Sequence, residues 1–273
     1  MIELPEAAVI ARQVKEQLKG KKIESVIANY TPHKFANYTG DPDKYDDILK
    51  GKIITDAYAV ANHIYFVIED MTLIVNTPVS YFIKSQSMPA NHQLYLKFTD
   101  EDFITCTIRM WGVFYLFKTD QKEEYGYDVE KNKPSPLSNE FTKTYFNNLF
   151  VSVKNTLSVK AFLTTEQRIP GLGNGVLQDI LWHAKINPKC KLSKMTTDQV
   201  ENLYESIVKT LKEMEKLGGR CSEKDLFSKY GGYQTIMCDK NISNPCPVCG
   251  SKIVKSSYMG GNVYYCVECQ KDD

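Results

Sequence analysis

The chain has 273 residues, 42% hydrophobic and 25% charged, which is typical of a soluble globular protein with room for two domains. It contains no apolar run near the roughly 18 residues of a membrane span, and charges occur throughout its N-terminal segment, which argues against a secretory signal. The net charge of +1 neither favours nor excludes nucleic acid, because acids elsewhere can balance a basic face. We therefore predict a cytoplasmic protein with no membrane partner.

The N-terminal stretch from Met1 to Glu6 places a proline and two glutamates ahead of an amphipathic helix predicted over residues 6–19. Pro5 suits a first helical turn because its missing N–H needs no partner there, and Glu6 complements the positive end of the helix dipole. Two interpretations remain open at this point. These residues either mark the start of a helix or belong to a chemical site at the N-terminus.

Residues 22–118 form short runs rich in β-branched and aromatic residues, separated by turn residues. This pattern predicts an antiparallel β sandwich or barrel. Arg109 and Trp111 are two residues apart in one such run, which places them on one face of a predicted strand. Trp111 is then either a core residue or a wedge that enters a DNA duplex. The polar segment 119–138 predicts a linker or a domain boundary.

The following region is helical in its periodicity, with candidate helices at 139–149, 158–166, 174–185 and 196–217. Gly171, Gly173 and Asn174 lie where one candidate ends and the next begins, a pattern equally compatible with a phosphate-binding turn and a plain turn. Between residues 150 and 220, eleven basic side chains stand against seven acidic ones. This excess favours a phosphate-facing surface, although a solvated helix face has the same composition.

Four of the eight cysteines lie within the last 28 residues, as the pairs Cys246-x2-Cys249 and Cys266-x2-Cys269. Each pair presents two thiolates to one ion, and four thiolates complete a closed tetrahedral zinc site. Four sulfur ligands leave no open position for water. The predicted cofactor is therefore one structural Zn²⁺ that holds a small hairpin beginning near Asn241.

The ELPE start, the β-rich region, the GLGN segment ending in INP and the CxxC-x16-CxxCQ tail occur together in this order. In these features the chain resembles the formamidopyrimidine-DNA glycosylase and endonuclease VIII family of base-excision repair enzymes, over essentially its whole length. The resemblance implies an α+β fold that combines an N-terminal β sandwich with flanking helices, a helix-two-turns-helix domain and a zinc ribbon. We expect these parts at residues 1–134, 135–240 and 241–273, in a monomer that binds damaged or distorted DNA.

Members of this family flip a lesion base out of the duplex and fill the gap with wedge residues. The resemblance implies that Arg109 is the inserted arginine, that Trp111 stands for an intercalating phenylalanine, and that Val79 stands for a methionine wedge. It also implies that Glu3 is the catalytic glutamate and that Asn174 binds phosphate. The DNA-binding set implied in this way comprises Asn62, Val79, Arg109, Trp111, Lys160, Gly173 and Asn174, and the catalytic set Met1, Ile2 and Glu3.

Three positions depart from the family pattern. Ile2 stands where members expose a proline whose amine attacks the sugar C1′ to form a Schiff base, which then permits strand cleavage. Asn62 replaces the lysine of the family's GKHL motif, and Gly261 replaces the arginine of the zinc hairpin that grips phosphate.

Two functions are compatible with these departures. In the first, the protein is a DNA glycosylase with weak or absent AP lyase activity, in which Glu3 activates water or stabilises positive charge on the sugar. An Ile2 amine requires removal of Met1, and a retained Met1 displaces the amine by about 3.8 Å. In the second, the protein is a catalytically inactive binder of lesions or distorted DNA. We expect the glycosylase.

Overall fold

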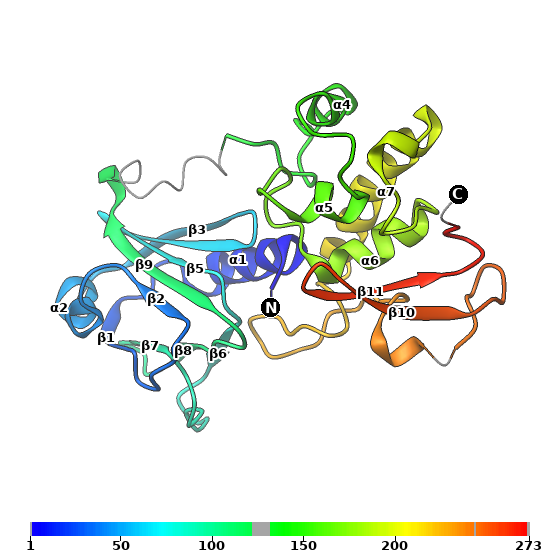
Figure 1. Cartoon of the computed structure of the whole chain (residues 1–273). Coiled ribbons are helices and arrows are strands. Elements are labelled where there is room, and N and C mark those ends of the chain that lie inside the picture. Colours follow the sequence, from blue (N-terminus) through cyan, green and yellow to red (C-terminus); the bar gives the residue numbers. More distant parts are fainter. Residues whose placement is uncertain (1, 122–131, 243, 272–273) are drawn as a thin grey trace. The chain divides into compact units, whose positions relative to one another are not determined.

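The computed structural model describes residues 2–121, 132–242 and 244–271 (Figure 1). Its contacts divide the chain into two units. The first unit contains Met1–Asn132 together with Leu217–Gly232, and the second contains Lys133–Lys216 together with Tyr233–Asp273. Each unit has a hydrophobic core of its own. The segment Leu217–Gly232 falls inside the range expected for the helix-two-turns-helix domain, yet it packs within the first unit.

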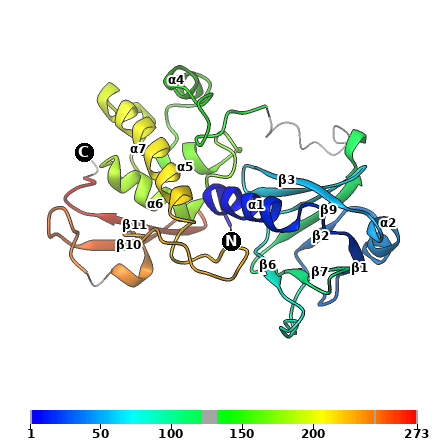
Figure 2. The ribbon, with the colours of Figure 1, turned by 180° about the vertical axis from the view of Figure 1, so that it is seen from behind.

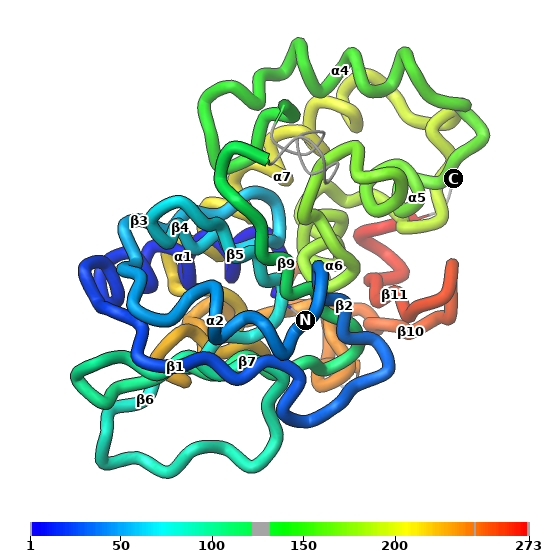
Figure 3. Tube along the Cα trace, turned by 90° about the vertical axis from the view of Figure 1, so that its left-hand side faces the viewer, coloured from blue at the N-terminus to red at the C-terminus, as the bar shows by residue number. Residues whose placement is uncertain are grey.

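Helix α1 (Leu4–Leu18) opens the first unit and begins two residues earlier than predicted. Glu3 is its N-cap residue in an extended conformation, and Pro5 lies in the first turn. The buried face of the helix, which includes Ile10 and Val14, packs against the sheet that contains β3 (Ile54–Val60) and β4 (His63–Ile68). Views from the front, the back and the side show α1 lying along this sheet (Figures 1, 2 and 3).

Two sheets form the body of the first unit, and their inward side chains share one core. One sheet has four antiparallel strands in the order β1-β7-β8-β6, and the other has five strands in the order β2-β9-β5-β4-β3. The strands are β1 (Ile23–Ala28), β2 (Ala36–Tyr38), β3 (Ile54–Val60), β4 (His63–Ile68), β5 (Met71–Val75), β6 (Val79–Phe82), β7 (Leu94–Phe98), β8 (Phe103–Cys106) and β9 (Gly112–Lys118), and the short helix α2 (Tyr45–Leu49) follows β2.

The predicted sandwich is confirmed, but its purely antiparallel character is wrong at one edge. Strand β2 pairs with β9 in parallel, with Ala36 opposite Gly112. Parallel pairing needs a long crossover instead of a hairpin, and here most of the two sheets lies between the paired strands along the chain. Local alternation of residues carries no information about that crossover.

The second unit contains four helices and a hairpin among its described residues. The four predicted helices are present with boundaries that differ by a few residues at most. They are α4 (Lys143–Val151), α5 (Val159–Thr164), α6 (Asn174–His183) and α7 (Thr197–Lys216). Strands β10 (Ile253–Tyr258) and β11 (Gly261–Cys266) pair antiparallel and pack against α6 through Trp182.

None of the helices in the described part of the chain combines the length and the apolarity that a bilayer span requires.

Candidate functional site

A buried ion pair joins the start of α1 to the segment that follows α7. The Glu6 carboxylate accepts hydrogen bonds from Nε and Nη2 of Arg220 at 2.9 and 2.8 Å, and from the Arg220 backbone N–H at 3.1 Å. Both side chains are almost fully buried. Burial by itself would raise the pKa of Glu6, but the charge and hydrogen bonds of Arg220 outweigh this effect and leave that pKa below its ordinary value. Glu6 is therefore held as a carboxylate.

Glu3 lies beside this ion pair. Its Oε2 atom is 3.7 Å from Nη1 of Arg220, and its backbone N–H donates to Oε2 of Glu6 at 3.0 Å. Only 7% of the residue is exposed. Both the side chain and the backbone of Glu3 are thus held by the Glu6–Arg220 pair. We refer to Glu3, Glu6 and Arg220 below as the carboxylate cluster.

Ile2 precedes the cluster and belongs to the core. The residue is fully buried and contributes to the same hydrophobic cluster as Ile10 and Val14 of α1. Packing alone therefore accounts for an isoleucine at this position. Met1, the remaining member of the predicted catalytic set, lies outside the described residues.

Arg109 is linked to the same segment through Glu223. Its Nη1 atom lies 3.1 Å from Oε2 of Glu223, and Glu223 in turn contributes to the electrostatic field around Arg220. Glu223 is almost buried, whereas nearly half of the Arg109 side chain is exposed. The arginine predicted to insert into DNA is thus held at its base by a buried acid.

The expectation that Arg109 and Trp111 share one strand face is wrong. Both residues lie in the loop between β8 and β9, which belong to different sheets, so the chain must leave one layer and enter the other at this point. The loop exposes 65% of Met110 and 41% of Trp111. Trp111 is therefore not a core residue, and its exposure is compatible with the wedge interpretation.

Two other predicted DNA-contacting residues of the first unit lie outside this loop in the sequence, and Val79 is next to its start. Val79 begins β6 opposite Cys106 and is 1% exposed, so it is a core residue and not a wedge. Its side chain belongs to the hydrophobic core that the two sheets share. Asn62 is half-buried in the two-residue turn between β3 and β4.

Three predicted residues of the second unit lie around the tip of the β10–β11 hairpin. Gly173 is the N-cap of α6, and the exposed Asn174 donates through its amide to the carbonyl of Asn262 at 3.0 Å. Lys160 donates through Nζ to the carbonyl of Tyr258 at 2.7 Å, and burial lowers its pKa. Because Lys160 is only 3% exposed, it supports the hairpin tip instead of presenting its charge to solvent.

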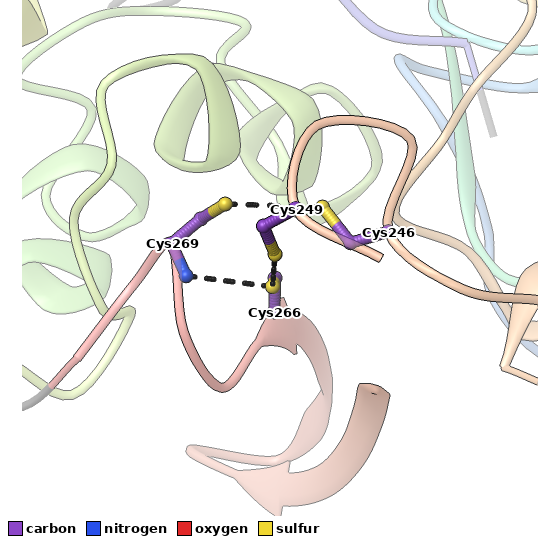
Figure 4. A group of neighbouring side chains, drawn as sticks. All are labelled: Cys246, Cys249, Cys266 and Cys269. Atoms are coloured by element: carbon purple, nitrogen blue, oxygen red, sulfur yellow. Dashed lines mark hydrogen bonds between the residues drawn. The ribbon is translucent and has the colours of Figure 1, made fainter. Parts of the chain in front are cut away.

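The four predicted metal ligands form one cluster at the other end of the hairpin (Figure 4). All four sulfur atoms lie within 4.8 Å of one another, with 3.8 Å between Cys246 and Cys269 and 3.4 Å between Cys249 and Cys266. A tetrahedral zinc with Zn–S bonds of about 2.3 Å separates its sulfur ligands by about 3.8 Å. The geometry of the thiols therefore fits a single metal ion of this type.

Arg220 was not identified from the sequence as a site residue. The charge count between residues 150 and 220 treated Arg220 and Lys160 as members of a phosphate-facing surface, whereas both are buried and bonded within the protein. The sequence does offer one signal for Arg220: the pair Gly218-Gly219 directly follows the candidate helix at 196–217 and indicates a sharp turn just before this residue. No local pattern names Glu6 as its partner.

Comparisons with known proteins agree with this architecture. The family model for the formamidopyrimidine-DNA glycosylase N-terminal domain matches residues 1–147, and that for the H2TH domain of the same glycosylase matches residues 133–225. The formamidopyrimidine-DNA glycosylase of Lactobacillus delbrueckii subsp. bulgaricus is 28% identical over 283 residues, covering 99% of this chain and 100% of that protein. That of Lactococcus lactis subsp. lactis is 28% identical over 281 residues with the same coverage.

Solved structures extend the similarity to the fold. The Lactococcus lactis Fpg in complex with DNA that contains an abasic site superimposes with a TM-score of 0.85 at 26% identity, covering 98% of this chain and 99% of that one. The complex of the same protein with DNA containing Fapy-dG gives a TM-score of 0.84 at 26% identity, covering 98% and 100%.

Two sheets around one core, four helices and a cysteine-bound hairpin define a DNA glycosylase fold with an H2TH domain. The chain belongs to the formamidopyrimidine-DNA glycosylase family, a family of DNA repair enzymes, which confirms the resemblance seen in the sequence.

Proposed function

We propose that this protein binds damaged DNA, flips out a lesion base and hydrolyses its N-glycosidic bond through Glu3, with little or no AP lyase activity. One observation carries the proposal. The carboxylate of Glu3 is held next to Arg220 in the first unit, while Ile2, at the position of the family's attacking amine, is fully buried in the core. The chain thus keeps the family's catalytic glutamate as Glu3, whereas a core residue, Ile2, stands where the family has its attacking amine.

The chemistry needs only water and Glu3. The carboxylate accepts a proton from the attacking water, whose oxygen bonds to C1′ as the C1′–N bond breaks. The departing base takes a proton from solvent, which leaves an abasic site with both flanking phosphodiesters intact. No Schiff base forms, so the strand is not cut by elimination.

The partner proposed here is duplex DNA with a damaged base. The related Lactococcus lactis protein has been solved with DNA that contains an abasic site and with DNA that contains Fapy-dG, which supports this class of ligand. Arg109 and Trp111, exposed on the loop between β8 and β9, are proposed to fill the space that the flipped base leaves. Asn174 is proposed to bind phosphate at the N-terminus of α6.

The cysteine cluster is proposed to hold one structural Zn²⁺. Cys246, Cys249, Cys266 and Cys269 would supply all four ligands, so the ion would fix the hairpin and take no part in the reaction. One chain supplies every group that this proposal uses, and we therefore propose that the protein acts as a monomer.

The decisive experiment separates base release from strand cleavage. Duplexes carrying single oxidised, ring-opened or alkylated bases are incubated with the protein, and each sample is analysed with and without hot alkali. We expect strand breaks only after alkali, no covalent adduct on borohydride trapping, and no base release by Glu3→Gln. Glu16→Gln, an exposed acid on the same helix, is the matched control and should behave as the wild type.

Two results would change the proposal. A borohydride-trapped adduct with strand cleavage before alkali would restore the amine mechanism. Lesion-selective binding without base release across the whole panel would leave a DNA-binding protein without glycosylase activity.

A further inference from the structure

Arg220 contacts two acidic side chains in different ways. Nε and Nη2 bind the two oxygens of Glu6 side by side, and this pairing leaves Nη1 directed at Oε2 of Glu3, at 3.7 Å. A guanidinium is planar and its N–H groups are fixed relative to one another. When Glu6 fixes two of its nitrogens, the position of the third nitrogen next to Glu3 is fixed as well.

The surroundings leave this arrangement little room to relax. Arg220 is 4% and Glu6 3% exposed, and separating the pair would leave a buried charge without its partner, so the pair stays closed. Gly219 has φ +98°, and a Cβ built on it would lie 3.2 Å from Cγ of Glu6. The backbone before Arg220 therefore packs directly against the side chain that Arg220 binds.

We propose that Arg220 is a positioning residue for catalysis, an inference that rests on the proposed function. It orients the Glu3 carboxylate toward the flipped nucleotide and does not itself contact the DNA. Glu6 contributes from the other side, because it fixes the guanidinium and also accepts the backbone N–H of Glu3. Glu3 is then held through both its backbone and its side chain. A carboxylate that activates water without help from an amine needs such a fixed position.

A purely structural role is the competing explanation, since the ion pair also attaches the segment Leu217–Gly232 to α1. The protein contains a second attachment that serves as a matched control. Gln13 of α1 donates to Oδ2 of Asp225 at 2.8 Å and accepts the backbone N–H of Leu226 at 3.0 Å. This contact joins the same two elements but has no bond to Glu3 among the described contacts. Gln13→Ala therefore loosens the segment without removing the guanidinium.

The experiment compares Arg220→Lys with Gln13→Ala in the full-length protein. The best lesion duplex from the panel is used to measure the single-turnover rate of base release at saturating protein, and separately the dissociation constant. Lysine keeps the charge but has one nitrogen in place of three, so it cannot bind both oxygens of Glu6 side by side and hold a further nitrogen fixed next to Glu3. We expect Arg220→Lys to slow base release about 100-fold, the size of effect expected from a shift of about 1 Å in a catalytic group. Its dissociation constant should change less than about threefold, and Gln13→Ala should change neither quantity by more than that.

Glu6→Asp is the second variant, in case Arg220→Lys does not fold. It keeps the ion pair but withdraws the carboxylate by one methylene, and we expect a smaller loss of rate, about tenfold. The positioning role of Arg220 would be overturned if Gln13→Ala slowed base release as much as Arg220→Lys and Glu6→Asp did. It would also be overturned if those two variants kept the wild-type rate, and in both cases the proposed function would still stand. If the wild-type protein releases no base, the proposed function fails first and the inference fails with it.

Discussion

The carboxylate cluster of the first unit and the cysteine cluster of the second are built in opposite ways. The four cysteines lie within one short hairpin, with 23 positions separating Cys246 and Cys269. Glu6 and Arg220 are 214 positions apart along the chain. The repeated spacing of its ligands makes the cysteine cluster visible in the sequence. The carboxylate cluster exists only because the chain returns to the first unit after α7. Loss of the cysteine cluster should therefore unfold only the hairpin, whereas loss of the Glu6–Arg220 pair should lower the stability of the whole first unit.

The strongest test of this contrast removes one cysteine. Cys249→Ser should lose the bound metal and unfold the hairpin, because such a small element depends on its ion for folding. We expect DNA affinity to fall by more than about 100-fold while the first unit stays folded. Metal content by mass spectrometry, DNA binding by anisotropy and circular dichroism check these outcomes. Cys221→Ser, outside the cluster, should retain both metal and binding, and a metal-free wild type that binds DNA normally would refute the prediction.

Breaking the long-range pair should instead reduce global stability. Glu6→Gln removes the only carboxylate that hydrogen-bonds the buried guanidinium of Arg220 among the described contacts, and leaves it with Glu3 at 3.7 Å and the charge of Glu223. We expect the free energy of unfolding to fall by about 3 kcal/mol, as for other buried ion pairs that lose one partner. Urea unfolding measures this change. Glu16→Gln on the exposed face should stay within about 0.5 kcal/mol of the wild type, and a similar value for Glu6→Gln would argue against the pair.

The same pair should make stability depend on pH. The folded-state pKa of Glu6 lies below its ordinary value of 4.5, because Arg220 overcomes the opposing effect of burial. The pair therefore stabilises the fold fully above that ordinary value, and this contribution is lost as the pH falls through the folded-state pKa. Urea unfolding at about pH 7, 5 and 3 should show a destabilisation by Glu6→Gln that is constant between the first two values and smaller at the third. A difference that grows toward low pH would have the wrong sign.

The loop between β8 and β9 should contribute selectivity more than affinity. Trp111→Ala should reduce the preference for lesion over undamaged duplex by about tenfold, the value of one base–aromatic stacking contact. Met110→Ala, which changes an even more exposed neighbour, is the matched control. Competition binding with both duplexes measures the ratio, and equal loss of affinity for both would contradict a wedge role for Trp111.

The smallest expected effect is an increase in DNA affinity, from a substitution at Gly261. A Cβ at Gly261 would lie 3.7 Å from Nδ2 of Asn174 and from Nζ of Lys160, so a Cβ meets no clash at this position. Gly261→Arg should strengthen DNA binding about threefold and steepen its salt dependence by about one charge. Gly261→Ala should leave both unchanged. A titration of affinity against salt distinguishes these outcomes, and an unaltered slope for the arginine variant would place this position away from phosphate.

Much of the fold could be predicted from the sequence because its signals are local. The helices follow apolar periodicity, and the cysteine hairpin follows the spacing of its ligands. The errors arise where side chains are placed by distant partners. Val79 is drawn into the core by its pairing with Cys106, and the run containing Arg109 and Trp111 breaks into a loop because it must change sheets. Arg220 is the extreme case, since its role depends on a carboxylate near the other end of the chain.

Two glycine pairs, Gly218-Gly219 and Gly231-Gly232, lie at the two ends of the segment that carries Arg220 and have a consequence for how it is held. Gly232 N–H bonds the carbonyl of Leu217 at 2.8 Å, and a Cβ on Gly231 would lie only 2.1 Å from the carbonyl oxygen of Gly219. The segment therefore leaves and re-enters through a neck in which backbone lies against backbone. The position of this segment is thus set by backbone contacts at its two ends as well as by the Glu6–Arg220 pair. Any side chain at Gly231 would have to displace that backbone, and would therefore move the segment that holds Arg220 next to Glu3.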